Sequence, residues 1–99
     1  MVSRSLAFVL ALGASTLASA QDPSHVRLLA AGCANCHGTD GRSQGGTPAL
    51  TGLAKALFVQ HMQDFKTGRR TATIMHQLSK GYTDAEIDAL GTYFAALKN

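Results

Sequence analysis

An all-α fold is what the sequence predicts for this chain of 99 residues. Three observations support this fold class. Apolar residues recur at spacings of three and four, which is the period of one helix face. No segment alternates apolar and polar residues over the length of a strand. Glycines and prolines separate the periodic segments, as they do where helices begin and end. We therefore expect a small helical domain without internal repeats.

The first 20 residues have the pattern of a secretory signal peptide. Arg4 provides a positive start, residues 6–17 form an apolar run, and Ala18-Ser19-Ala20 offers small residues at a cleavage site. The run is too short for a typical membrane-spanning helix. An uncleaved membrane anchor is the alternative, and the polar residues after Ala20 favour cleavage. We expect residues 1–20 to be removed and residues 21–99 to form one periplasmic domain that is not inserted in the membrane.

Size and charge limit the classes of function. A domain of this length buries a small core and commonly depends on a disulfide, a metal or a large cofactor. The full chain has a formal net charge of +3, and its basic residues are scattered apart from Arg69-Arg70. This charge gives no argument for nucleic acid binding. We expect something other than apolar side chains to complete the core.

The first helix is expected to begin at Asp22-Pro23, because Asp is a good N-cap and Pro fits the first helical position. Val26, Leu29 and Cys33 then follow at spacings of three and four on one face. Gly38 is expected to end the element. On such a helix Cys33 lies one turn from the next cysteine and the histidine after it, so all three can reach one ligand.

The segment Cys33-x-x-Cys36-His37 is the signature of covalent haem attachment. A disulfide across so short a loop would add little stability. A thioredoxin-like redox pair needs a βαβ setting, which the sequence does not predict. A zinc site would need a second pair of ligands at a suitable spacing. We therefore expect one haem c, attached to Cys33 and Cys36 by thioethers, with His37 on the iron.

A loop and a second helix are expected after the motif. Thr39 to Thr51 is rich in Gly, Ser, Thr and Asp, and a loop of about a dozen residues is long enough to suggest a function. The helix should run from about Leu53 to Lys66 and stop at Gly68. Its spacings predict a buried side that contains Leu57, Phe58, His61, Met62 and Phe65.

The last helix has the clearest start signal in the chain. Gly68 to Ile74 is expected to form an exposed turn that leads to Met75. Thr83-Asp84-Ala85-Glu86 then fits a capping box, with Glu86 at the third helical position. The residues that follow at spacings of three, four and three are Ile87, Leu90, Phe94 and Leu97.

Haem iron in an electron carrier is expected to have a protein ligand on both axial sides, which leaves no open site for oxygen chemistry. Methionine sulfur suits the second side and raises the reduction potential. Met75 is favoured because it stands in an irregular stretch, whereas Met62 has the spacing of a core residue. His76 keeps a His–His site open at this point. His25 and His61 are expected at the surface or at a helix edge.

A ligating histidine usually donates its second ring N–H to a carbonyl or a carboxylate. The backbone around Pro48 is a candidate acceptor for His37, because it is a rigid point in a loose loop. The alternative is that Pro48 only shapes a turn. The two interpretations are equally compatible with the residues themselves.

Several segments together resemble class I cytochromes c, in particular the cytochrome c4 and c553 type. They are Cys33–Gly41, Pro48–Leu53, Asp64–Gly68, and Met75, which precedes Tyr82-Thr83-Asp84 by seven residues. The match covers nearly all of residues 21–99. It implies a small class I cytochrome c fold wrapped around one covalently attached haem. It also implies Met75 as the second axial ligand and the Pro48 carbonyl as the acceptor of the His37 proton.

One variant of this family is similar over further short segments. Phe58-Val59, Met62, Phe65–Gly68, Thr73–Met75 and Lys80–Tyr82 resemble the haem subunit of flavocytochrome c sulfide dehydrogenase. In that family a flavoprotein subunit oxidises sulfide at its flavin and passes electrons to the haem subunit. This chain departs from the two-haem members because it has one haem motif. The resemblance implies a periplasmic, non-enzymatic, monohaem subunit that accepts electrons from a flavoprotein. The alternative is a free c4/c553-like shuttle to a terminal oxidase or another oxidoreductase.

Two other classes are weaker. A haem enzyme such as a peroxidase would need an open or displaceable Met75 side, and no distal acid–base pair stands out. A non-haem disulfide or zinc module would lack a red colour. The basic side chains of Lys55, Lys66, Arg69 and Arg70 either steer an acidic partner toward a haem edge or form an ordinary solvated surface.

Overall fold

The computed structural model describes Gly13 and residues 22–98. The predicted signal peptide, residues 1–20, lies outside the described residues apart from Gly13. Residues 22–98 form five α-helices and two 3₁₀ turns, and this part of the chain contains no strand, which confirms the all-α prediction. The elements are α1 (Pro23–Ala31), α2 (Ala34–His37), a turn at Thr39–Gly41, α3 (Lys55–Thr67), α4 (Met75–Leu78), a turn at Ser79–Gly81, and α5 (Asp84–Ala96).

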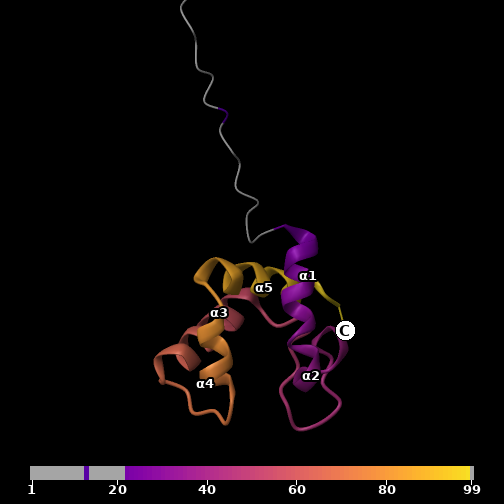
Figure 1. The fold of residues 1–99 in the computed structure, drawn as a ribbon. Coiled ribbons are helices and arrows are strands. Elements are labelled where there is room, and N and C mark those ends of the chain that lie inside the picture. The colour runs from indigo at the N-terminus through magenta and orange to yellow at the C-terminus, as the bar shows by residue number, and fades with distance from the viewer. Residues whose placement is uncertain (1–12, 14–21, 99) are drawn as a thin grey trace, which may run out of the picture.

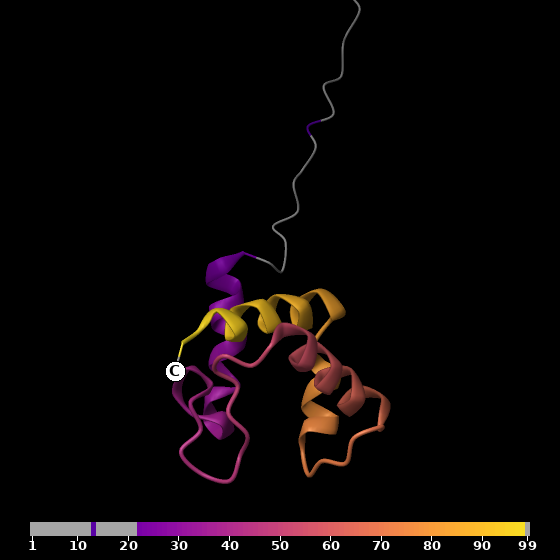
Figure 2. The same ribbon diagram turned by 180° about the vertical axis from the view of Figure 1, so that it is seen from behind.

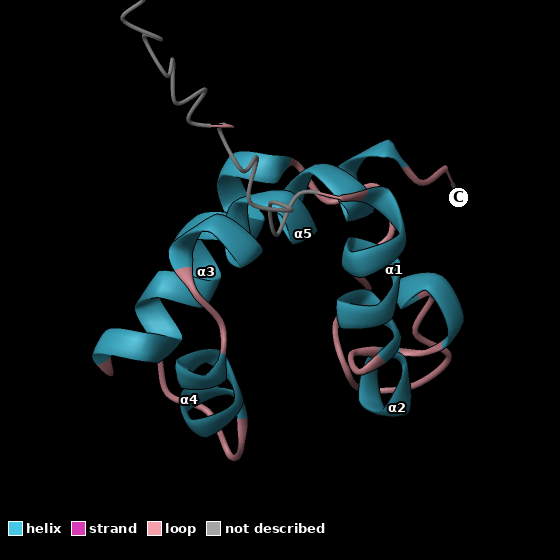
Figure 3. Ribbon diagram, turned by 45° about the horizontal axis from the view of Figure 1, so that its top comes forward, coloured by secondary structure: helices cyan, strands magenta, loops and turns pink. Residues whose placement is uncertain are grey.

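Two arms lie on either side of α5 (Figure 1). One arm contains α1, α2 and the loop that follows, and the other contains α3 and α4. The reverse view and the tilted view show the same separation of the arms (Figures 2 and 3). Helix α5 contacts both α1 and α3, so it joins the two arms. None of the helices in the described part of the chain is long and apolar enough to cross a membrane.

Helix α1 begins as predicted but ends early. The Asp22 carboxylate accepts a hydrogen bond of 2.9 Å from the Ser24 N–H, and Pro23 occupies the first helical position. The expectation of one element reaching Gly38 was wrong, because the chain breaks after Ala31. There the N–H groups of Gly32 and Cys33 bond to carbonyls three residues back. Such bonds tighten the turn, so α2 starts as a separate helix.

Helix α3 packs on α5 through fewer residues than the spacings predicted. Phe58 and Met62 are buried, as expected, and Gly68 ends the helix with φ +78°. Leu57 is 50% exposed, so the prediction that it is buried was wrong. One residue is a rotation of about 100° on a helix, and α3 turns the Phe58 side toward α5. His61 and Phe65 are half-buried.

The core is small and centres on α5. Ile87, Leu90 and Phe94 are almost completely buried, which confirms the predicted stripe, whereas Leu97 caps the helix and is half-buried. The other buried apolar residues are Val26, Ala30, Phe58, Met62 and Ala89. Gly91 allows α3 to approach closely, since a Cβ there would lie 3.1 Å from Lys55 Cγ and 3.3 Å from the Phe58 ring.

The capping box at the start of α5 is confirmed. The Thr83 hydroxyl accepts from the Glu86 N–H at 3.1 Å, and the Glu86 carboxylate accepts from the Thr83 N–H at 2.9 Å. Two N–H groups that the helix itself leaves without partners are thereby satisfied. The hydrogen bond from the Thr83 backbone holds the pKa of Glu86 below its ordinary value.

Candidate haem site

Helix α2 carries both cysteines and the histidine of the motif. Cys33 is the N-cap and is half-buried, Cys36 is exposed, and His37 is the last helical residue. The cysteines are not bonded to one another. Gly38 then turns the chain with φ +85°, and a Cβ there would lie 2.5 Å from the Arg42 carbonyl oxygen. Only glycine fits this position without a shift in the backbone.

Burial raises the pKa of the Cys33 thiol above its ordinary value. The side chain is therefore neutral at physiological pH. A thioether is also neutral, so attaching a cofactor to Cys33 places no charge in these apolar surroundings. The position thus suits a covalent attachment point better than it suits a reactive thiolate.

His37 is fixed by the loop that follows it. Its Nδ1 atom lies 2.6 Å from the carbonyl oxygen of Pro48. A carbonyl only accepts hydrogen bonds, so Nδ1 carries the proton and donates it. In the neutral imidazole the lone pair then lies on Nε2. This is the arrangement in which a histidine presents Nε2 to a metal ion.

A second set of contacts joins the same two segments. The Leu50 N–H donates to the Gly41 carbonyl at 2.8 Å, and the Thr51 hydroxyl donates to the Asp40 carbonyl at 2.6 Å. Gly41 has φ +75°, and a Cβ there would lie 2.8 Å from the Leu50 Cβ. Thr51 could not be recognised from the sequence, because a threonine in a turn has no distinctive pattern.

Met75 begins the short helix α4, so the prediction that it lies in an irregular stretch was wrong. It is half-buried and packs against the core. Helix α4 lies on the arm opposite α2 (Figures 1 and 2). The two predicted axial ligands, His37 and Met75, therefore belong to different arms.

The arm that carries Met75 also exposes large apolar side chains. Leu57, Ile74 and Leu78 are 50%, 49% and 47% exposed. Leu28 on the other arm is 74% exposed, so both arms carry exposed apolar side chains. The donor set fits haem c. It consists of two thiols, an imidazole with a free Nε2 and a thioether.

The rival ligands occupy different positions in the fold. Met62 is buried in the core, as its spacing predicted. His25 is exposed and lies 3.8 Å from the Glu86 carboxylate, and His61 is half-buried on α3. His76 follows Met75, and its buried Nδ1 has no hydrogen-bond partner in the described part of the chain. Among residues 22–98, no three His, Cys, Asp or Glu side chains gather as a metal site.

The basic residues divide into two groups. Lys55 and Lys66 reach across to acidic residues of α5, at 3.1 Å from Asp88 and 3.6 Å from Asp84. Arg69 is exposed, and the Arg70 guanidinium lies 5.1 Å from the centre of the Phe65 ring. Both lysines thus form surface ion pairs between α3 and α5, and the interpretation as ordinary surface is favoured for them.

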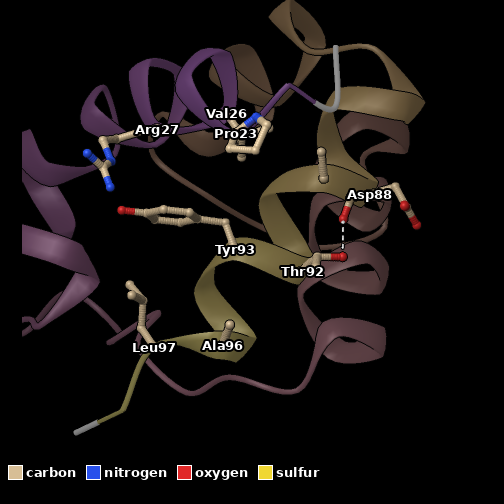
Figure 4. Close-up of a pocket in the computed structure, with 9 residues that line it drawn as sticks. Pro23, Val26, Arg27, Asp88, Thr92, Tyr93, Ala96 and Leu97 are labelled. Atoms are coloured by element: carbon tan, nitrogen blue, oxygen red, sulfur yellow. Dashed lines mark hydrogen bonds between the residues drawn. The ribbon is translucent and has the colours of Figure 1, made fainter. Parts of the chain in front are cut away.

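A separate groove lies between α1 and α5 (Figure 4). Its volume is about 590 Å³, and its walls are mainly apolar, with Val26, Tyr93 and Leu97 among them. Arg27 and Asp88 contribute charged groups. It contains none of the predicted site residues, so the groove is distinct from the candidate haem site.

Comparison with known proteins supports haem c as the cofactor. The cytochrome c family matches residues 26–98. The cytochrome subunit of sulfide dehydrogenase from Chlorobaculum tepidum is 40% identical over 74 residues, which are 75% of this chain and 67% of that protein. Cytochrome c4 from Pseudomonas aeruginosa is 34% identical over 95 residues, 94% of this chain and 47% of its own length. Cytochrome c-553 from Helicobacter pylori is 32% identical over 92 residues, 91% of this chain and 96% of that protein.

The chain therefore spans about half of the cytochrome c4 and two thirds of the sulfide dehydrogenase subunit that it resembles. The resemblance to both types is confirmed. Three findings lead to one conclusion: the Cys33–Cys36 pair is followed by His37, the fold is helical, and the family match covers most of the sequence. This chain belongs to the cytochrome c family, whose members carry covalently attached haem c and transfer electrons.

Proposed function

We propose that Cys33 and Cys36 hold the haem through thioethers and that His37 and Met75 are its axial ligands. The contact of 2.6 Å between His37 Nδ1 and the Pro48 carbonyl is the observation that carries this assignment. It leaves Nε2 free for the iron and fixes the ring in one orientation. Met75 on the opposite arm supplies the second donor, a sulfur.

The bound haem supplies an iron that gains and loses one electron. The residues of this chain keep the surroundings of that iron constant in both oxidation states. Pro48 fixes the His37 ring, and the packing of α4 against α3 fixes Met75. A sulfur ligand and apolar surroundings favour the reduced state and raise the potential.

The partner is a flavoprotein that oxidises sulfide, and this chain is its haem subunit. The identity of 40% with the cytochrome subunit of sulfide dehydrogenase supports this assignment. Sulfide is then oxidised on the separate, flavin-bearing chain, and this chain accepts the electrons one at a time. The signal-peptide pattern of residues 1–20 supports export of this chain to the periplasm.

A free electron shuttle is the second candidate. One observation favours it, since this chain covers 96% of the cytochrome c-553 that it resembles. A shuttle of this kind would carry electrons to a terminal oxidase or another oxidoreductase. It uses the same haem site, so the two candidates differ only in the donor and in the lifetime of the complex.

Gentle purification from the periplasm at low salt separates the two candidates. For the subunit we expect haem bands and flavin to elute together, and sulfide to reduce the haem rapidly. As a control, the same preparation is passed through high salt to release the haem chain, which sulfide should then reduce much more slowly. Haem without flavin at low salt, with equally slow reduction before and after the wash, contradicts the subunit and favours the shuttle.

A further inference from the structure

Thr51 is a buried hydroxyl residue next to the His37 loop. It is 6% exposed, and its Oγ1 donates to the Asp40 carbonyl at 2.6 Å. The Leu50 N–H donates to the Gly41 carbonyl at 2.8 Å. Residues 50–51 are therefore tied to the turn that directly follows His37. We call these two hydrogen bonds the loop clamp.

The loop clamp lies close to the contact between His37 and Pro48. Both His37–Pro48 and Asp40–Thr51 join residues that are eleven positions apart. Asp40 is three residues after His37, and Thr51 is three residues after Pro48. Three residues span at most about 11 Å, so the two pairs are close neighbours along both sides of the loop.

Pro48 has little packing of its own to hold its carbonyl in place. Its side chain is exposed, and so is its hydrogen bond with His37. By contrast, the chain just beyond Thr51 is anchored in the core, where the Gly52 N–H donates to the Phe94 carbonyl at 2.9 Å. The clamp thus connects a rigid part of the fold to the exposed segment that carries Pro48.

Asp40 gives a second reason for the clamp. It has φ +53° and is the one non-glycine residue with positive φ in the described part of the chain. A residue with a side chain adopts this conformation at a cost and keeps it only when its surroundings hold it. The Thr51 hydroxyl bonds the carbonyl of this residue, so it supports the turn where it is strained.

We propose that Thr51 is a positioning residue that sets the hydrogen bond between His37 and Pro48, and through it the donor strength of His37 toward the haem iron. The inference rests on the proposed role of His37 as axial ligand. A full hydrogen bond to Nδ1–H makes the imidazole a stronger donor, which stabilises the oxidised iron. Loosening that bond therefore shifts the potential to more positive values.

The test compares Thr51→Val, which keeps the shape and removes the hydroxyl, with Thr51→Ser, which keeps the hydroxyl. NMR of the reduced haem-loaded protein measures the solvent exchange of the His37 ring N–H, and potentiometry measures the midpoint potential. In Thr51→Val we expect exchange to be faster by about tenfold, as for the loss of one hydrogen bond, and the potential to be more positive. Thr51→Ser should restore both values.

Thr92→Val is the matched control. The Thr92 hydroxyl also bonds a backbone carbonyl, that of Asp88 at 3.3 Å, but it lies on the exposed side of α5. Its removal should change neither ring exchange nor the potential. If Thr51→Val does not mature, Thr51→Ala replaces it in the comparison with Thr51→Ser.

Unchanged exchange and potential in a folded Thr51→Val or Thr51→Ala protein overturn the inference, even if the melting temperature falls. A failure of the ligand assignment gives a different result. In that case the His37 ring protons of the unmodified protein lack the large shift that a haem ring imposes on its axial ligand.

Discussion

At the scale of single residues, the sulfur of Met75 has the strongest expected effect on the haem. Met75→Ala removes the proposed axial ligand, so we expect a lower midpoint potential and a high-spin or histidine-ligated oxidised spectrum. His76 is the neighbouring nitrogen donor. The visible spectrum and a potentiometric titration measure both effects. An unchanged spectrum would show that Met75 is not a ligand.

Met62→Leu is the control for that substitution. Met62 is buried in the core and is 6% exposed. The two side chains have similar volumes, so the change should cost less than about 1.5 kcal/mol of stability. We expect the spectrum and the potential to stay as they are, because the Met62 sulfur packs against the core residues instead of binding iron.

Ser79 offers a residue-scale test of stability. It is completely buried, and its hydroxyl has no hydrogen-bond partner in the described part of the chain. A buried hydroxyl without a partner destabilises a fold by about 1–3 kcal/mol. Ser79→Ala should therefore leave the free energy of unfolding unchanged or raise it. Denaturant unfolding of the haem-loaded protein measures this, and a loss of more than about 1 kcal/mol would reveal a partner for the hydroxyl.

The residues at the site differ in how far the sequence could predict them. Cys33, Cys36 and His37 are recognisable because their chemistry and their order along the chain are specific. For Pro48 the sequence allowed two interpretations, an acceptor for His37 or a residue that only shapes a turn. The fold brings its carbonyl oxygen to 2.6 Å from His37 Nδ1. Thr51 could not be identified, since its importance comes from the carbonyl that it meets across the loop. Nothing in a threonine itself specifies that contact.

At the scale of elements, the start of α5 makes the stability depend on pH. The hydrogen bond from the Thr83 backbone N–H lowers the pKa of Glu86 below its ordinary value of 4.5. The ionised Glu86 carboxylate contributes its full stabilisation of the folded state above pH 4.5, the ordinary pKa. This stabilisation is lost as the pH falls through the lower pKa that Glu86 has in the folded state. The pKa of Asp84 is also lowered, because the hydrogen bond from Gln63 and, to a smaller extent, the charge of Lys66 stabilise its ionised form.

Glu86→Gln tests this dependence, because glutamine can still accept from the Thr83 N–H but does not titrate. We expect the unfolding free energy of the unmodified protein to fall more steeply than that of the variant when the pH is lowered from about 5 to 3. Thermal unfolding across this range measures both slopes. Parallel slopes would show that Glu86 has no lowered pKa in the folded protein.

The helices that the sequence located well are those whose ends have local causes. Asp22-Pro23, Gly68 and the Thr83–Glu86 box act through their own backbone neighbours, and each lies where it was predicted. The break between α1 and α2 depends on hydrogen bonds at Gly32 and Cys33, which the spacing of apolar residues does not specify. The exposure of Leu57 depends on which side of α3 meets α5, and this is set by tertiary packing.

At the scale of the whole molecule, the two arms meet mainly through α5. The buried apolar residues come from α1, α3 and α5, and they include two alanines, so the core is small for a chain of this size. Helices α2 and α4 contribute no buried residue, although they carry His37 and Met75. The haem is therefore expected to act as the missing part of the core and to hold α2 and α4 in place.

Removing the haem tests this view of the molecule. The double variant Cys33→Ser/Cys36→Ser cannot form thioethers, so the chain is made without a covalent cofactor. We expect it to lose cooperative thermal unfolding and much of its helical circular dichroism, because α2 and α4 have no core of their own. Thr92→Val, which retains the haem, is the control and should unfold cooperatively. A haem-free double variant with a sharp transition and unchanged helicity would show that the apolar residues around α5 suffice for the fold, and that the haem serves electron transfer alone.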